Sequence, residues 1–153
     1  MHLDDTANVL GSAEFFGICN LEQRRMLAFA SEWIQLKAGD VLFKAGQVSP
    51  GAYVLVSGEL TSTPKSGSKE KSVAITEPGT VIGELALIVK GERRASVVCK
   101  SNAQLLMVPR SAFLKLMQQF PEIAAKAQEQ VRSDIEKYIS PIEQVSKVSG
   151  LKK

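Results

Sequence analysis

The sequence predicts one mainly β domain flanked by α-helices, whose β part is an antiparallel sandwich, barrel or jelly roll. Three observations lead to this prediction. The chain has 153 residues, of which 44% are hydrophobic and 23% charged, and this fits a single globular domain with its own core. Between residues 33 and 108, short apolar runs are separated by Gly, Pro and Ser about every 8–12 residues, which is typical of antiparallel β-proteins. Helical patterns precede and follow this segment.

The first expected element is an α-helix over Leu21–Ala30, for which Asn20 is a suitable N-cap. Its apolar face is expected to consist of Leu21, Met26, Leu27, Phe29 and Ala30. Short strands are then expected at Trp33–Leu36, Val41–Phe43, Tyr53–Val56, Glu59–Thr63, Ser72–Thr76, Ala95–Lys100 and Gln104–Val108. Ser57-Gly58 is typical of a tight hairpin turn between two of these strands.

Three further helices are expected. Glu84–Val89 contains helix formers without a breaker and predicts one short helix between strands, and Arg110–Gln119 predicts the next. Pro121 suits the first turn of a helix that runs to about Ser140. On this helix, three- and four-residue intervals form one narrow apolar stripe of Ala124, Ala127, Val131, Ile135 and Tyr138. Residues 141–153 are expected to be a flexible tail.

Charge and residue usage exclude several classes of function. The net charge is +3 and the basic residues are scattered, so nucleic-acid binding by this chain alone is not expected. Cys19 and Cys99 are far apart, and His2 is the one histidine in the sequence. Zinc sites and Ser-His-Asp catalysis are therefore not expected, and neither is any other enzyme activity. No signal peptide or membrane span is visible in the sequence, which predicts a cytoplasmic protein.

The segment from Ile82 to Val97 carries the chemistry. Gly83 precedes the expected short helix, so the backbone N–H groups of Leu85 and Ala86 should be exposed at a helix N-terminus that attracts anions. An arginine near the following strand can add a charge-assisted contact to phosphate. Glu84 supplies an acceptor suited to a sugar hydroxyl. The combination fits a ribose cyclic phosphate.

This segment resembles the phosphate-binding cassette of cyclic nucleotide-binding domains, with the pattern G-E-[LI]-[AC]-L-[LI]-x(4)-R-x-A-[ST]-V. Such domains occur in the catabolite activator protein, kinase A regulatory subunits and cyclic-nucleotide-regulated channels. The segments Gly39–Gly46 and Tyr53–Leu60 are similar to the β-roll signature of the same family. The resemblance implies an antiparallel β jelly roll (a double-stranded β-helix) with an N-terminal helix and two C-terminal helices. The domain would cover residues 1–140, with the β-roll at about 33–108 and the lid helices at about 110–140.

The resemblance also implies roles for individual residues. Arg93 would bind the exocyclic phosphate oxygens, assisted by backbone N–H groups near Leu85 and Ala86. Glu84 would accept the ribose 2′-hydroxyl, and Gly83 would let the loop close. The base would be contacted by the segment Val73-Ala74 and lidded by Tyr138, together with Ile135. The ligand would be cAMP or, with less support, cGMP.

The cassette also departs from the family pattern. The family usually has Ser, Thr or Ala directly after the phosphate-binding arginine. In this sequence that position, between Arg93 and Ala95, is Arg94. The loss of a hydroxyl at this position favours cAMP over cGMP. It also leaves open a register in which Arg94 holds the phosphate, although Arg93 fits R-x-A-[ST]-V. Gln47 and Pro50 replace acidic or amide residues that are common in the preceding turn of the family.

Several functions stay open at this point. The chain is expected to be a cyclic nucleotide sensor that moves its C-terminal helix on binding and signals to an effector protein that the sequence does not identify. A ligand-free β-roll interaction domain is one alternative. The sensor fragment of a larger transcription regulator, kinase or channel is another, since the thirteen residues after Ser140 are too few for a helix-turn-helix. The apolar stripe on residues 121–140 favours a homodimer.

Overall fold

The computed structural model describes residues 3–65 and 71–138, with side chains up to residue 133. Helices α1 (Leu3–Ser12) and α2 (Leu21–Ala30) flank the 3₁₀-helix η1 (Glu14–Ile18). The β part comprises β1 (Glu32–Leu36), β2 (Val41–Phe43), β3 (Gly51–Ser57), β4 (Leu60–Pro64), β5 (Val73–Ile75), β6 (Val81–Ile82), β7 (Ala95–Cys99) and β8 (Ala103–Pro109). The 3₁₀-helix η2 (Glu84–Leu87) lies between β6 and β7, and α3 (Arg110–Gln119) and α4 (Pro121–Tyr138) follow β8.

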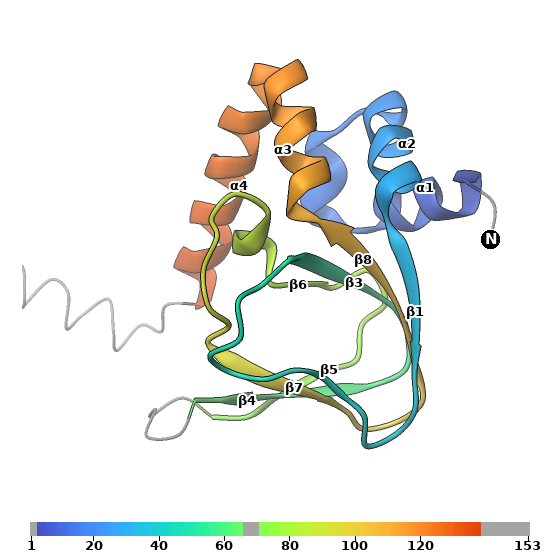
Figure 1. The fold of residues 1–153 in the computed structure, drawn as a ribbon, viewed down its shortest axis with the longest axis vertical. Coiled ribbons are helices and arrows are strands. Elements are labelled where there is room, and N and C mark those ends of the chain that lie inside the picture. Colours follow the sequence, from blue (N-terminus) through green and yellow to red (C-terminus); the bar gives the residue numbers. More distant parts are fainter. Residues whose placement is uncertain (1–2, 66–70, 139–153) are drawn as a thin grey trace, which may run out of the picture.

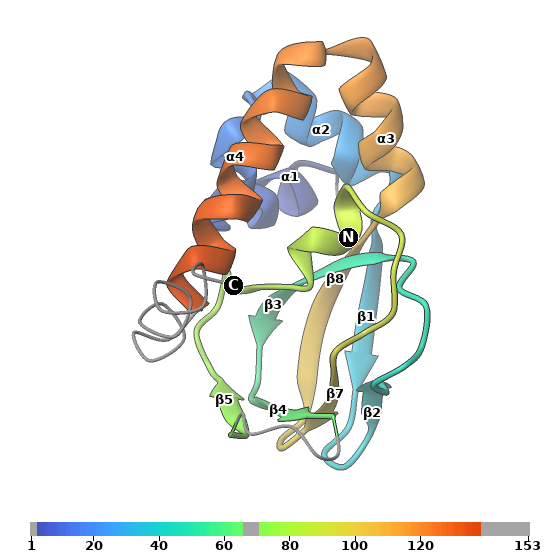
Figure 2. The ribbon, with the colours of Figure 1, turned by 90° about the vertical axis from the view of Figure 1, so that its left-hand side faces the viewer.

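The strands form two four-stranded antiparallel sheets, with the orders β1-β8-β3-β6 and β2-β7-β4-β5. The chain crosses between the sheets to make a roll, and the helices gather at one end of it (Figure 1). Turned by 90°, the structure shows α4 descending past η2 toward the roll (Figure 2). The fold class expected from the sequence is therefore confirmed: an antiparallel β-roll with helices on its flanks. No described helix is long and apolar enough to cross a membrane.

Two groups of buried side chains stabilise this arrangement. One lies between the helices and the β1-β8-β3-β6 sheet. It includes Phe15, Phe16 and Phe113, whose rings contact one another with centroids 5.1–6.4 Å apart. The other fills the interior of the roll around Leu55, Leu60 and Leu105. Burial of this apolar area is the main favourable contribution to folding.

The N-cap expected at Asn20 is confirmed, but the apolar face expected for α2 is largely wrong. Asn20 and Gln23 form a capping box, in which the Gln23 N–H donates to Asn20 Oδ1 at 2.8 Å and the Asn20 N–H donates to Gln23 Oε1 at 2.9 Å. This exchange holds Gln23 in the interior together with Leu27 and Ala28. Phe29, by contrast, is 84% exposed, because it lies on the solvent side of the helix.

Other expectations need correction at the start of the chain, before η2 and in α4. Helix α1, η1 and the two-residue strand β6 were not predicted. The buried residues of α4 are Ile123, Ala127 and Val131, whereas Ala124 is half-buried. These buried residues pack into the core of the same chain, against η1 and α3. The side chains of Ile135 and Tyr138, and the expected tail 141–153, lie outside the described residues.

Candidate functional site

The cassette begins at Gly83, which has φ 76° and ψ 39° and is the N-cap of η2. Such left-handed backbone favours glycine. The expected helix Glu84–Val89 is in fact a four-residue 3₁₀ turn, Glu84–Leu87. The Ala86 N–H donates to Gly83 O at 3.0 Å, so this donor is not exposed as expected. A single turn sums few peptide dipoles, and any attraction for an anion must come mainly from arginines.

Arg93 is buried beneath the cassette, with 7% of its surface exposed. Its guanidinium carbon lies 4.1 Å from the ring centroid of Phe43 and 5.5 Å from that of Tyr53, distances at which cation–π attraction is significant. One terminal nitrogen, Nη2, donates to Gly51 O at 2.6 Å. Burial lowers the pKa of Arg93, contacts with Tyr53 oppose that change, and the positive charge of Arg110 adds to it.

The charge of Arg93 is not neutralised within the described residues. No carboxylate lies within 4.0 Å of it in that part of the chain. Its Nε is buried and has no hydrogen-bond partner there. Burying a guanidinium without a counter-charge is costly, and so is burying an unpaired N–H group. An anion that reached Arg93 would offset both costs.

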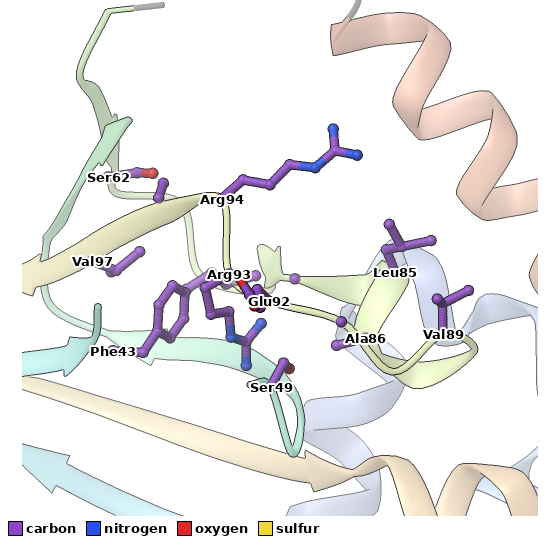
Figure 3. Close-up of a pocket in the computed structure, with 14 residues that line it drawn as sticks. Phe43, Ser49, Ser62, Leu85, Ala86, Val89, Glu92, Arg93, Arg94 and Val97 are labelled. Carbon is purple, nitrogen blue, oxygen red and sulfur yellow. The ribbon is translucent and has the colours of Figure 1, made fainter. Parts of the chain in front are cut away.

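A cavity of about 260 Å³ opens beside Arg93, close to the lower end of the roughly 300–1,000 Å³ that is usual for small-molecule sites. Its lining comes from β2, β4, β6, β7, the cassette and the turn before β3. The lining residues are Phe43, Ser49, Ser62, Ile82, Gly83, Leu85, Ala86, Val89, Gly91, Glu92, Arg93, Arg94, Ala95 and Val97. In Figure 3 the side chain of Arg93 points toward Ser49, whereas that of Arg94 extends away from it. Arg94 is exposed.

The structure brings six of the site residues predicted from the sequence to this cavity: Gly83, Leu85, Ala86, Arg93, Arg94 and Ala95. Glu84 is not among the lining residues, although it is half-buried at the start of η2. Tyr138 belongs to the last turn of α4, but its side chain is outside the described part of the chain.

The predicted base-contacting pair divides between two faces of the sheet. Ser62 is paired with Val97 on one side and with Val73 on the other, so these three side chains share one face. Ser62 and Val97 line the cavity, and Val73 continues their row at the open edge, where it is 57% exposed. Ala74 is paired with Thr61 and therefore points to the opposite face. A base in the cavity would meet the side chain of Val73 and not that of Ala74.

Comparison with known proteins identifies the family to which this fold belongs. The family model described as "Cyclic nucleotide-binding domain" matches residues 33–120, which is more than half of the chain. The chain belongs to the cyclic nucleotide-binding domain family. Its fold is also that of the regulatory domain of Toxoplasma gondii PKA and of the Thermus thermophilus Catabolite Activator Protein, with TM-scores of 0.73 and 0.70.

This cyclic nucleotide-binding domain is similar in sequence to three proteins of different kinds. The Cyclic AMP receptor protein of Thermus thermophilus is 29% identical over 115 residues, which are 74% of this chain and 53% of that protein. A cyclic nucleotide-binding-like protein of Brucella abortus has a solved structure that is 33% identical, with a TM-score of 0.62, over 75% of this chain and 99% of its own. A lysophospholipase of Aspergillus fumigatus is 34% identical over 96 residues, or 62% of this chain. The chain spans 6% of the length of that lysophospholipase, so its name carries no activity over to this domain.

Sequence reasoning missed several residues of the site in this cyclic nucleotide-binding domain. Phe43, Ser62 and Val97 lie in strands that were predicted, and the alternation of inward and outward side chains along those strands could have identified them. Ser49 and the carbonyl of Gly51, which receives Arg93, could not have been found that way, because their position depends on contacts between distant segments.

Proposed function

We propose that this domain binds a 3′,5′-cyclic nucleotide in the cavity under the cassette, with the cyclic phosphate at Arg93. The observation that carries the proposal is the buried guanidinium of Arg93, which lines the cavity and has an unpartnered Nε and no carboxylate partner among the described residues. A phosphate would supply both the charge and the acceptor that Arg93 lacks. The N–H of Leu85, in the first turn of η2, has no intrahelical acceptor and would assist.

The rest of the ligand would extend from Arg93 toward the open edge of the roll. The base would lie against the row formed by Val97, Ser62 and Val73. Tyr138 would lid the base from α4, and Glu84 would accept the ribose 2′-hydroxyl once the cassette closes on the ligand. Arg94, exposed at the cavity, replaces the hydroxyl that would favour guanine. The ligand we favour is therefore cAMP over cGMP.

Ligand binding would act by shifting a conformational equilibrium. The phosphate would stabilise one arrangement of the cassette, α3 would move with it because α3 packs on η2, and α4 would follow because it packs on α3. The ligand can shift this equilibrium only by its difference in affinity for the two arrangements. The moved α4 would present the signal to a separate effector protein, and the protein would work in the cytoplasm.

A homodimer through residues 121–140 is a further part of the proposal. Ile123, Ala127 and Val131 are buried within the chain, so a second copy would have to contact the later part of the helix, where Ile135 and Tyr138 lie. Sedimentation velocity with and without cAMP tests this. A single monomeric species over a wide concentration range would contradict the homodimer without affecting the binding site.

A ligand-free structural roll is the second candidate, and one observation favours it. Arg93 already has a carbonyl partner and two aromatic neighbours inside the protein, so it stabilises the roll without any ligand. A larger chain that carries this roll as one segment, as in a transcription regulator, kinase or channel, is compatible with both candidates.

Isothermal titration with cAMP and, separately, cGMP decides between the two candidates. We expect saturable binding of one nucleotide per chain, with cAMP the tighter of the two. Matched titrations with adenosine, which lacks the phosphate, should show at least a large loss of affinity. Absence of heat with both cyclic nucleotides at high protein concentration, together with an unchanged thermal midpoint in excess ligand, would overturn the binding proposal and leave the structural roll.

A further inference from the structure

The turn Ser49–Gly51 is held by donors from two arginines that lie far apart in the sequence. The carbonyl of Ser49 accepts from Arg110 Nη1 at 2.6 Å, and the carbonyl of Pro50 accepts from the Arg110 backbone N–H at 2.8 Å. The carbonyl of Gly51 accepts from Arg93 Nη2 at 2.6 Å. Three consecutive carbonyl groups of one turn therefore connect the proposed phosphate-binding arginine to the first residue of α3. We call this set of contacts the carbonyl relay.

Arg110 also contacts the cassette directly. Its Nη1 lies 3.3 Å from the carbonyl oxygen of Ala86 in η2, in addition to its bond with Ser49. Arg110 is half-buried and is not among the residues that line the cavity. It would thus touch the protein around the ligand without touching the ligand.

The turn is packed against the β8–α3 junction with no space between them. A Cβ on Gly51 would lie 2.1 Å from Val108 O and 3.0 Å from Arg110 N, and both of these are backbone atoms. Glycine is required here because the contacting atoms belong to the backbone, which cannot move aside as a flexible side chain could. A displacement of the turn must therefore move the start of α3 or break its hydrogen bonds.

We propose that Arg110 is a positioning residue that couples the cassette and the Ser49–Gly51 turn to the first turn of α3. In the ligand-free state the carbonyl relay holds these three segments together. This inference deepens the proposed function, and the part that concerns ligand rests on it. A phosphate that drew Arg93 away from Gly51 O would break the Arg93 hydrogen bond of the carbonyl relay and free the turn to shift. Because Arg110 is bonded to the same turn, the start of α3 would shift with it.

The side-chain chemistry explains why arginine suits this position. A planar guanidinium has five donors in a fixed fork and can hold two carbonyl groups at once. A lysine has a compact ammonium on a flexible chain and would have to divide itself between Ser49 O and Ala86 O. A methionine of similar length would leave both without this donor.

Hydrogen exchange of the ligand-free protein tests the coupling, whether or not a nucleotide binds. We expect Arg110→Met to speed amide exchange about tenfold or more in two segments remote in sequence, the Ser49–Gly51 turn and η2. Arg110→Lys should give a smaller increase in both. Arg25→Met is the control, because Arg25 lies on α2 in an exposed ion pair with Asp4, and neither segment should change.

Faster exchange confined to α3 in both Arg110 variants, with the turn and η2 as in the wild type, would overturn the proposal. If Arg110→Met does not fold, the Arg110→Lys result decides alone.

A titration then tests the part that depends on ligand. We expect Arg110→Met to bind cAMP about tenfold more weakly and to lose the ligand-dependent protection of α3. Wild-type affinity together with wild-type protection of α3 in this variant would overturn the coupling. If the wild-type protein binds neither cAMP nor cGMP, the proposed function fails, and exchange in the ligand-free protein still decides the role of Arg110.

Discussion

The guanidinium of Arg93 occupies the space that a side chain at Gly83 would need. Its Nη1 atom lies 2.1 Å from the position of an ideal Cβ on Gly83. The absence of a side chain at Gly83, the first residue of the cassette, thus leaves room for the guanidinium of Arg93, which is buried directly beneath it. The glycine of the cassette pattern has a second reason here, besides its left-handed backbone.

The first prediction concerns this contact. Gly83→Ala should lower the free energy of unfolding by about 1–2 kcal/mol, because alanine in left-handed backbone is strained, and should also displace Arg93 and weaken cAMP binding. Gly39→Ala is the matched control, since Gly39 has φ 92° and nothing within 4 Å of the added Cβ. Both variants should unfold more readily in denaturant, but a titration should show weakened binding in the Gly83 variant alone. Equal affinity in the two variants would show that the Gly83–Arg93 contact does not matter for the ligand.

The second prediction decides which arginine holds the phosphate. Arg93→Ala should weaken cAMP binding by about 1.5–3 kcal/mol, or roughly 10- to 150-fold, the usual range for a hydrogen bond to a charged group. Arg94→Ala should have a much smaller effect, because Arg94 is exposed and solvent screens its charge. Calorimetric titration of both variants checks this. The reverse order of effects would assign the phosphate to Arg94.

The third prediction concerns Glu84. Glu84→Gln should weaken cAMP binding, because the proposed role of the carboxylate is to accept the ribose 2′-hydroxyl. The 2′-deoxy analogue of cAMP supplies the control. It should bind the wild type and the variant with the same affinity, since it has no hydroxyl to lose. A similar loss for both nucleotides would mean that Glu84 acts through the conformation of η2 and not through the ribose.

Local patterns predicted those parts of the fold that local chemistry determines. The predicted N-cap at Asn20 depends on backbone N–H groups of the next few residues, and the hairpin turn at Gly58 requires φ 97°. The cassette was recognisable for the same reason, since Gly83 and Arg93 belong to one continuous pattern. In such segments, neighbouring residues impose the conformation on one another.

Features that depend on distant contacts were not predictable. Phe29 and Leu27 are both apolar residues of α2, but tertiary packing buries Leu27 and leaves Phe29 exposed. Val73 and Ala74 point to opposite faces because side chains alternate along a strand, but the register of β5 with β4 decides which of the two faces the cavity, and the sequence does not reveal that register. The partner of Arg93, the carbonyl of Gly51, is 42 residues away in the chain, and a backbone oxygen leaves no trace in a sequence pattern.

The fourth prediction concerns stability at high pH. Burial raises the pKa of the Cys19 thiol from 9.0 to about 11, against opposing effects of the positive charges of Arg24 and Lys126. The folded state therefore keeps this thiol protonated at pH values where the unfolded state ionises it. Below pH 9 the contribution of Cys19 to stability is complete. Between pH 9 and about 11 it should fall by up to about 1.4 kcal/mol per pH unit, and above that range both states are ionised and the loss ends.

Denaturant unfolding of the wild type and of Cys19→Ala, each from pH 7 to 11, isolates this contribution, because all other ionisable groups are common to both proteins. The variant should be less stable at pH 7, since it loses a buried side chain. Its stability should then fall less steeply than that of the wild type above pH 9, so that the difference between the two proteins narrows as the pH rises. A constant difference over the whole range would mean that the Cys19 thiol ionises equally in the folded and unfolded states, and that its environment is not the dry interior that the structure describes.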